Sequence, residues 1–317
     1  MKATLAVRQA VRPWLEKSTS TILLGVSGGA DSLALAIGTF LEAQERTVIP
    51  VVIDHGLQDL SATVAEETAE KLMALGYAKV EIVKVAVELS DGLEASARRA
   101  RYDAFEKLIS HYKADYFFLG HTQDDLAEQV LLGLARGSGT RSLSGMAVEN
   151  GKFIRPLLEI SRATTVEVCK ENSINPWNDP HNADQRFARA KVRHKILPLL
   201  ESELGPGISD ALARTSRILR EDADALDDIA QDFLDASDTF DALAVEDLAS
   251  LPKAVRSRVL RSLLHSAGVP MGTLTADHLE PVEALITAWR GQGATSLPGG
   301  VKVERISGRL SLSQPAK

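Results

Sequence analysis

Six residues near the start of the chain, Ser27-Gly28-Gly29-Ala30-Asp31-Ser32, have the types and order of a phosphate-binding turn. An apolar run precedes them and another follows, so that a strand ends at the glycines and a helix begins after them. The two glycines let backbone N–H groups approach a phosphate closely, and the new helix adds its unpaired N–H donors. The serine hydroxyls can donate further hydrogen bonds, and Asp31 can hold a divalent cation against phosphate oxygens. The segment therefore predicts a site for phosphate groups.

This segment differs from two common phosphate-binding patterns. A Walker A loop has more widely spaced glycines followed by Lys-Ser or Lys-Thr, and here no lysine follows until Lys71. The dinucleotide fingerprint has three spaced glycines, whereas this segment has a single Gly-Gly pair. The alternative is a tight turn with capping serines. Six matched positions between a strand and a helix favour the phosphate site.

Further polar groups follow two other predicted strands. Asp54 closes the second strand, where a carboxylate can contact ribose, adenine or a metal ion, or can cap the next turn. Gly120 and His121 close the fourth strand and lead into Asp124 and Asp125. Paired carboxylates beside a histidine suit Mg²⁺ ligation and removal of a proton from an incoming amine. The alternative at this segment is an N-capped helix with a polar first turn.

Two arginine-bearing segments lie near these strand ends in the sequence. In the predicted helix 92–112, Arg98, Arg101 and Phe105 fall on one stripe at spacings of three and four. Such arginines could neutralise a phosphate or a developing negative charge, or could simply form a solvated helix face. Arg136 opens a glycine-rich loop, and could either reach a phosphate or belong to a connector.

A basic stretch near position 190 has the charge pattern of a polyanion-binding surface. It contains five lysines and arginines within ten residues and no acid: Arg186, Arg189, Lys191, Arg193 and Lys195. The alternative is an ordinary basic surface helix.

Strands and helices alternate through the first part of the chain. The strands predicted at 22–26, 47–53, 80–87 and 116–119 are separated by helices. This order is typical of an α/β fold with a doubly wound, mainly parallel sheet, in which ligands bind beyond the carboxyl ends of the strands. All of the polar strand ends described above therefore meet at one edge of the sheet.

The second part of the chain is expected to be a separate, mainly helical domain. Helices are predicted at 246–267 and 275–290, and alternation with Gly-containing turns predicts a small β-hairpin at 295–313. Between 221 and 247 the chain has acidic residues and no basic one, which predicts a face directed away from phosphates. We predict domains at residues 1–205 and 206–317.

Length and composition fit this organisation. The 317 residues are 44% hydrophobic, with one cysteine and a net charge of −7. One cysteine excludes an internal disulfide and a Cys-x-x-Cys metal or redox site, so we expect a cytoplasmic protein. No apolar segment is long enough to span a membrane, and the first 18 residues lack a secretory apolar core.

Together these segments resemble the tRNA(Ile)-lysidine synthetase family, which belongs to the PP-loop ATP pyrophosphatase superfamily. The resemblance covers about the first two hundred residues with specific motifs, and the helical remainder only loosely. The matching segments are 27–32, 54–57, 98–105, 120–128, 136–139, 155–158 and 178–193. The chain would be a short form, without the additional C-terminal domain of longer members.

The resemblance implies a two-step ligation at the wobble cytidine of an isoleucine tRNA with a CAU anticodon. ATP adenylates the cytosine C2 oxygen with release of pyrophosphate, and the amine of free L-lysine then displaces AMP to give lysidine. The implied partners are this tRNA, free lysine, ATP and Mg²⁺; a homodimer is compatible with the sequence, and no membrane is involved.

The resemblance also implies roles for individual residues. ATP would be bound by Ser27, Gly28, Gly29, Ala30, Asp31, Ser32 and Asp54, and Mg²⁺ by Asp31 and Asp124. The catalytic candidates are Arg98, Arg101, His121, Asp125 and Arg193, and the tRNA-binding candidates are Arg136, Arg186, Arg189, Lys191 and Lys195. The proton acceptor for lysine is left open between a carboxylate and the histidine near Asp125 and His121.

Two alternatives remain. One is another ATP pyrophosphatase of the superfamily, such as an amide synthetase or a different tRNA-modifying enzyme; a tRNA thiolase would need more cysteines than Cys169. The other is a non-enzymatic nucleotide sensor on the same sheet, which would have no reason to combine Asp31, Asp54, Asp124 and Asp125. ATP–pyrophosphate exchange that depends on tRNA separates an enzyme from a sensor.

Overall fold

A computed structural model of the chain describes residues 1–56, 60–87, 93–137, 139–178, 186–237, 242–270 and 273–313. Leu57, Ser138 and 179–185, which belong to the segments that carry the resemblance, lie outside these residues. The chain divides into two compact units, Met1–Leu219 (unit 1) and Arg220–Lys317 (unit 2), and the division falls inside helix α10 (Ile208–Asp235). The boundary predicted after residue 205 stays a prediction. In the part of the chain that is described, no helix is both long and apolar enough to cross a membrane.

Unit 1 is built on a six-stranded sheet in the order β3-β2-β1-β4-β6-β5. The strands are β1 (Ile22–Gly25), β2 (Val48–Asp54), β3 (Glu81–Lys84), β4 (Tyr116–Leu119), β5 (Glu149–Asn150) and β6 (Phe153–Ile154). All neighbours pair in parallel except β5 and β6, which are antiparallel. The α/β class with a mainly parallel sheet is therefore confirmed. The two-residue strands β5 and β6 are too short to show a period in the sequence.

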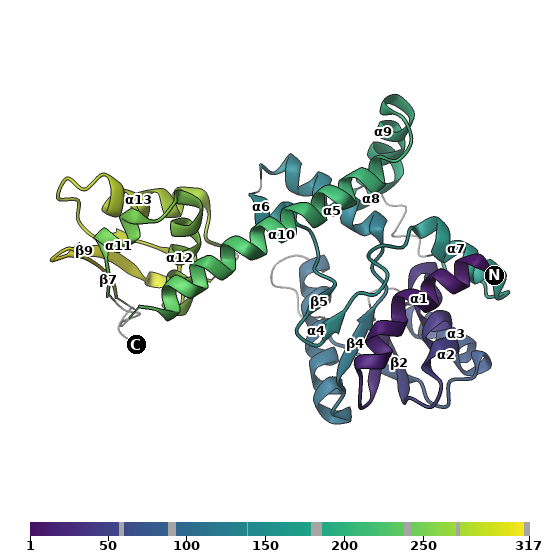
Figure 1. The fold of residues 1–317 in the computed structure, drawn as a ribbon. Helices are drawn as coiled ribbons and strands as arrows, with labels where there is room; N and C mark the ends of the chain where they lie inside the picture. The colour runs from purple at the N-terminus through teal and green to yellow at the C-terminus, as the bar shows by residue number, and fades with distance from the viewer. Residues whose placement is uncertain are drawn as a thin grey trace. The chain divides into compact units, whose positions relative to one another are not determined.

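Helices cover both faces of this sheet (Figure 1). Ile22 and Leu24 of β1 pack in one core with α1 (Lys2–Lys17), α2 (Ala30–Ala43), α3 (Ser61–Leu75) and α7 (Arg162–Glu171). Leu23, which points to the opposite face, packs with Phe105 and Ile109 of α4 (Leu93–Tyr112). Because successive strand residues alternate between faces, a wholly apolar β1 is what a sheet covered on both sides requires.

The remaining helices of unit 1 follow β4 and β6. They are α5 (Gln123–Ala135), α6 (Thr140–Leu143), α8 (Ala188–Lys191), a π-helical turn η2 (Val192–Ile196) and α9 (Leu197–Leu204). The basic stretch near position 190 thus lies on α8 and the π turn rather than on one regular α-helix. Val192, the first residue of the π turn, and Leu197, which follows the turn, pack against Ala127 of α5, and this packing fixes the basic segment on that helix.

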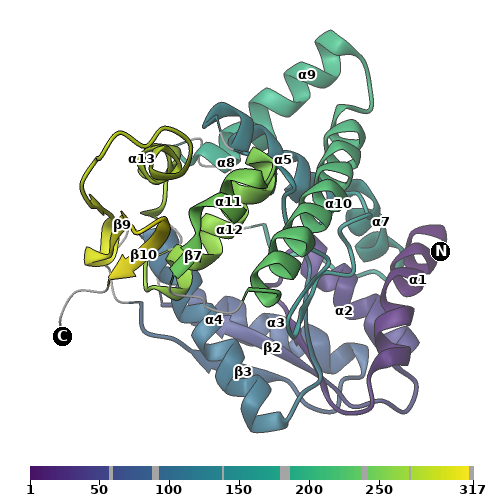
Figure 2. The ribbon, with the colours of Figure 1, turned by 60° about the vertical axis from the view of Figure 1, so that its left-hand side comes forward.

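Unit 2 combines helices with a four-stranded antiparallel sheet in the order β7-β10-β9-β8 (Figure 2). Its elements after α10 are β7 (Ala242–Ala244), α11 (Val245–Ser250), α12 (Lys253–Ser266), α13 (Ala276–Thr287), β8 (Thr295–Ser296), the 3₁₀ turn η4 (Pro298–Gly300), β9 (Lys302–Ile306) and β10 (Arg309–Ser313).

Two expectations for unit 2 need correction. The predicted hairpin exists as β9 and β10, but it is the centre of the four-stranded sheet rather than a separate ribbon. The helix predicted at 246–267 is two helices, because Leu251 is extended (ψ 144°), as the residue before Pro252 is expected to be.

Candidate active site

The turn between β1 and α2 has the geometry of a phosphate-binding loop. Gly28 has φ +83°, and a Cβ there would lie 2.5 Å from the Thr68 hydroxyl oxygen, so only glycine fits this position without strain. The Ser27 N–H donates to the Ser32 hydroxyl oxygen at 3.1 Å, and the Ser32 hydroxyl donates to the Gly29 carbonyl at 3.0 Å. The Ser32 hydroxyl therefore holds the shape of the loop, rather than being reserved for a ligand.

Two more segments meet the loop. The Trp177 N–H donates to the Gly28 carbonyl at 2.9 Å. On the side of β4, a Cβ on Gly120 would lie 3.0 Å from the Ser32 Cα, so this glycine lets the two strand ends approach each other. Since β1 and β4 are paired neighbours, the first turn of α2 and the start of α5 lie at the same sheet edge, as predicted.

Helix α5 presents two buried carboxylates one turn apart. Asp125 is its third residue and forms a capping box with Thr122, whose N–H donates to Asp125 Oδ2 at 2.8 Å. Glu128 follows three residues later and has no exposed surface. The N-capped helix considered as an alternative is therefore present, and the same Asp125 also takes part in ion pairs through Oδ1.

Arg162, at the start of α7, connects the phosphate loop with α5. Its guanidinium donates to Asp31 Oδ2 at 3.2 Å, to Asp125 Oδ1 at 3.0 Å and to Glu128 Oε1 at 3.2 Å. Its backbone N–H donates to Asp124 Oδ2 at 2.7 Å. Sequence reasoning missed this residue. The only available signal was its position, a few residues after the matching segment 155–158.

Two arginines of the basic segment complete the arrangement. Arg189 contacts Glu128 Oε2 at 2.8 Å and Asp125 Oδ1 at 3.1 Å. Arg193, one turn later, contacts Glu128 Oε1 at 2.6 Å and Asp125 Oδ1 at 3.2 Å. We call these side chains, together with those described above, the carboxylate–arginine cluster: Asp31, Asp125, Glu128, Arg162, Arg189 and Arg193.

The basic segment thus has two faces. Arg189 and Arg193 point toward α5, while Arg186, Lys191 and Lys195 are exposed. The structure therefore brings Arg193 to the strand edge, where a catalytic role was expected. It also brings there Arg189, which was expected on the tRNA-binding surface, because residues four apart share one face of a helix and so reach the same carboxylates.

The pKa values of two carboxylates in the cluster, Asp125 and Asp31, are shifted in opposite directions. Burial acts to raise the pKa of Asp125, but Arg162, Arg189 and the Thr122 N–H outweigh it and hold that pKa below its usual range. The pKa of Asp31 is raised, mainly by burial, with Arg162 and Thr165 opposing the shift. Although burial works against its charge, Arg162 has a raised pKa because Asp125, Asp31 and Glu128 surround it. Asp125 is therefore a firmly ionised group and a poor proton acceptor.

His121 lies at the same edge with one ring nitrogen unused. Its Nδ1 is buried and has no hydrogen-bond partner among the described residues. Burial lowers the pKa of His121 to about 4; Asp125 opposes this shift, and Arg155, Arg189 and Arg98 add to it. The imidazole is therefore neutral at pH 7, and the same low pKa makes it a weak base.

The other predicted residues are only partly at this edge. Asp54 Oδ1 accepts from the Ser61 hydroxyl at 2.6 Å and from the Gly56 N–H at 3.1 Å, and these bonds, Ser61 first, hold the pKa of Asp54 below its usual value. Asp54 therefore caps the turn, as the alternative anticipated.

The predicted arginines outside the cluster differ in their surroundings. Arg98 of α4 stacks on Tyr102, 4.8 Å from the ring centre, and its charge acts on His121. Arg101 is exposed on the same helix, and Arg136 is exposed at the end of α5. Of the predicted stripe, Phe105 is buried in the core beneath the sheet.

The donor set at the loop suits Mg²⁺. Within the described ranges no three His, Cys, Asp or Glu side chains gather as a metal site. Asp31 and Asp124 both bind Arg162, through Nε and the backbone N–H respectively, so these two carboxylates converge beside the loop. Mg²⁺ is commonly held by one or two carboxylates together with substrate phosphates. Asp31 and Asp124 fit that requirement.

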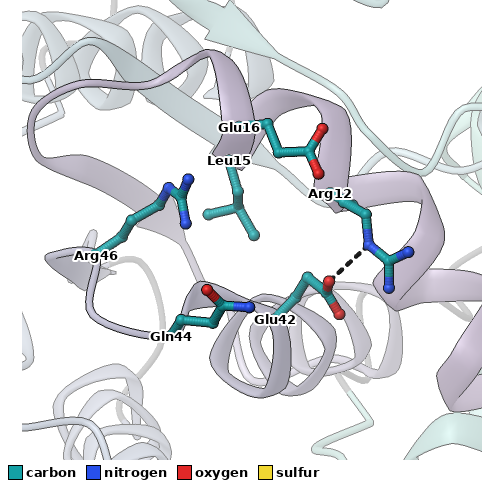
Figure 3. Close-up of a pocket in the computed structure, with 6 residues that line it drawn as sticks. All are labelled: Arg12, Leu15, Glu16, Glu42, Gln44 and Arg46. Atoms are coloured by element: carbon teal, nitrogen blue, oxygen red, sulfur yellow. Dashed lines mark hydrogen bonds and ion pairs between the residues drawn. The ribbon is translucent and has the colours of Figure 1, made fainter.

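A small cavity elsewhere in unit 1 is not part of this site. It has a volume of about 100 Å³ and lies between the end of α1 and the end of α2 (Figure 3). Arg12 contacts Glu42 there at 2.6 Å. Since α2 begins at the phosphate loop, its last turn is at the opposite edge of the sheet from the cluster.

Comparison with known proteins identifies the class first. Residues 2–200 match the family model of the PP-loop domain, and residues 243–311 match the TilS substrate binding domain. The chain is 46% identical to a tRNA(Ile)-lysidine synthase of Thermobifida fusca, with 97% of this chain and 95% of that protein covered. It is 48% identical to one of Streptomyces coelicolor, with 92% and 85% covered. The chain therefore belongs to the tRNA(Ile)-lysidine synthase family.

A solved structure with a similar fold is a U34-tRNA thiolase, NcsA from Methanococcus maripaludis with its [4Fe-4S] cluster. Its TM-score is 0.55 at 19% identity, with 69% of this chain and 79% of that chain covered. At this identity the likeness concerns the fold alone.

Proposed function

We propose that this chain is an ATP-dependent ligase that attaches free L-lysine to C2 of the wobble cytidine of an isoleucine tRNA with a CAU anticodon. The observation that carries the proposal is the carboxylate–arginine cluster, which joins the phosphate loop to α5 and to the basic segment through Arg162. A reaction between the triphosphate of ATP and a base of an RNA needs these groups at one place. Family membership over nearly the full chain supports the same activity.

In the first step the phosphate loop holds ATP. Backbone N–H groups at Gly28 and Gly29 and the first turn of α2 are suited to bind the β- and γ-phosphates. The cytosine C2 oxygen attacks the α-phosphorus, the bond to the bridging oxygen breaks, and pyrophosphate leaves. Mg²⁺ on Asp31 and Asp124 would offset the charge that develops on pyrophosphate. Asp54, at the end of the neighbouring strand, would contact the nucleoside through its carboxylate.

In the second step the lysine amine attacks C2 and AMP leaves with the former C2 oxygen. The attacking ammonium must first lose a proton. Among the groups at this edge we assign the acceptance of that proton to His121 on geometry, because its buried Nδ1 has no hydrogen-bond partner among the described residues. Burial makes the imidazole a weak base, so the transfer needs the ammonium held directly against Nδ1. Asp125 is held by a cap and by three arginines, so its role is to position Arg162, Arg189 and Arg193.

The tRNA would meet the outer face of the basic segment. Arg186, Lys191 and Lys195 are exposed there, and each phosphate contact would contribute a salt-dependent part of the affinity. Arg98, Arg101 and Arg136, also exposed, are further candidates for contacts with the phosphates of ATP or RNA. Since both tRNA and free lysine are cytoplasmic substrates, we expect the enzyme in the cytoplasm.

The proposal is tested with purified protein, ATP, Mg²⁺, labelled lysine and two transcripts that share the CAU anticodon, one of isoleucine and one of methionine tRNA. Label should enter the isoleucine transcript at its wobble cytidine, with one AMP formed per lysine. Equal labelling of both transcripts would contradict the specificity. Label in neither, with lysine or another amine transferred elsewhere, would contradict the reaction and favour a different PP-loop enzyme.

A further inference from the structure

Unit 2 presents an exposed aromatic ring beside two arginines, just after α13. Trp289 exposes 39% of its surface and is the only exposed tryptophan among the three in the chain, all of which are described. The guanidinium carbon of Arg305, on β9, lies 5.4 Å from the centre of its ring. Arg290 follows directly and is exposed. We call Trp289, Arg290 and Arg305 the Trp289 platform.

Hydrogen bonds to backbone groups hold this platform in place. The Gln292 side chain accepts from the Arg290 N–H at 2.5 Å and donates to the Ala288 carbonyl at 3.0 Å. Arg305 donates to the Leu285 carbonyl at 3.2 Å, in the last turn of α13. The turn that carries Trp289 is therefore tied to the helix end on two sides. A turn that is already ordered loses little conformational entropy when a ligand binds to it.

The charges around the platform favour an anionic partner. Glu283 is the acidic residue of α13 nearest to Trp289 in the sequence, and it is paired with Arg256 at 2.6 Å. Glu304 precedes Arg305 on β9 and so lies on the opposite face of the sheet. The acids of α10, by contrast, make that helix unsuited to phosphate contact. An exposed indole with guanidinium groups beside it fits a partner that combines planar rings with phosphates.

We propose that the Trp289 platform binds the RNA substrate by stacking an unpaired base on Trp289, with Arg290 contacting an adjacent phosphate. This inference rests on the proposed function, and assigns to one turn of unit 2 a contact with the tRNA. Stacking on an aromatic ring tolerates any base, since every base has a π face. The platform therefore contributes affinity and position, while the site in unit 1 performs the chemistry.

The test measures binding of the isoleucine transcript to the full-length protein by filter binding at several salt concentrations. Trp289→Ala should weaken binding roughly 5- to 150-fold, the range for loss of one base stack, while Trp289→Phe should keep most of the affinity. Arg290→Ala should lower the slope of log K against log salt by about 0.9, as expected for one phosphate contact. Ile306→Ala, which alters another exposed side chain of the same unit, is the matched control and should bind like the unchanged protein.

Thermal unfolding shows whether each variant is folded. If Trp289→Ala is folded and binds the transcript as tightly as the unchanged protein, the inference is wrong, and the platform serves another partner or only packs the helix end. If Trp289→Ala unfolds, the inference is tested by the RNA affinity of Trp289→Phe and by the salt dependence of binding in Arg290→Ala. An unchanged salt slope for Arg290→Ala overturns the inference. Failure of the unchanged protein to form lysidine would overturn the proposed function. A loss of RNA binding in Trp289→Ala would still support the RNA contact in that case, so the two failures can be told apart.

Discussion

Replacing Arg162 with glutamine should damage both the stability of unit 1 and its use of ATP. Removing one partner of a buried ion pair typically costs about 3–5 kcal/mol, because a buried charge is left uncompensated. Here each carboxylate keeps another donor: Asp31 keeps Thr165, and Asp125 and Glu128 keep Arg189 and Arg193. We therefore expect a loss of about 2 kcal/mol, or a fall of about 4–8 °C in Tm for a unit of this size.

The same substitution changes the charge beside the phosphate loop. Three carboxylates face three guanidinium groups in the cluster, so Arg162→Gln leaves one excess negative charge where a triphosphate must bind. The KM for ATP should rise. Arg162→Lys keeps the charge but cannot contact three carboxylates through one planar group, so its Tm and KM should be intermediate.

Calorimetric unfolding and initial rates of AMP formation measure the two effects. The matched control is Arg217→Gln, which removes an exposed ion pair with Glu159 in the same unit and should change stability by less than about 1 kcal/mol. An Arg162→Gln protein with the Tm and the ATP dependence of this control would refute the reasoning, since the cluster would then be an incidental surface contact.

Three further predictions concern single features of the site. Gly28→Ala should weaken ATP binding at least about tenfold, because the φ of +83° at Gly28 and the approach of Thr68 at 2.5 Å both disfavour a Cβ. Gly29 has φ −75°, so Gly29→Ala should weaken ATP binding less in the same titration. For His121, a folded-state pKa of about 4 lies below the unfolded value of about 6.5, so the unfolded state binds more protons between these values. Stability measured by denaturant titration should therefore fall as pH falls from about 6.5 toward 4, and His121→Asn should remove that part of the fall; an equally steep acid limb in the variant would argue against a buried neutral imidazole. Replacing both Lys191 and Lys195 with alanine should lower the salt slope of tRNA binding by about 1.8 without a change in Tm, and an unchanged slope would remove them from the RNA interface.

Local sequence signals were sufficient for strands β1 to β4 of the sheet and for the turn that follows β1. The run at β1 is apolar at every position because helices cover both of its faces, and Gly28 stands where positive φ is needed. Asp125 and Glu128 are three residues apart, so their common face follows from the helix period. These features could be predicted because residues close in the sequence determine them.

The carboxylate–arginine cluster depends on contacts that the sequence does not display. Arg162 meets Asp31 across 131 positions of the chain, and nothing local distinguishes it from other arginines at a helix start. In the sequence Arg189 is no different from Lys191. Packing of Val192 and Leu197 on α5 turns Arg189 toward that helix and leaves Lys191 exposed. The four-stranded sheet of unit 2 was missed for a similar reason, because β7 has three residues and gains its identity from pairing with β10.

The central claim is that the phosphate loop and the cluster serve to activate an RNA base rather than an amino acid. ATP–pyrophosphate exchange measured with each substrate alone tests this most directly. We predict exchange with the isoleucine transcript in the absence of lysine, and its loss in Gly28→Ala. Exchange that requires lysine and proceeds without tRNA would mean that lysine itself is adenylated, and would contradict the account.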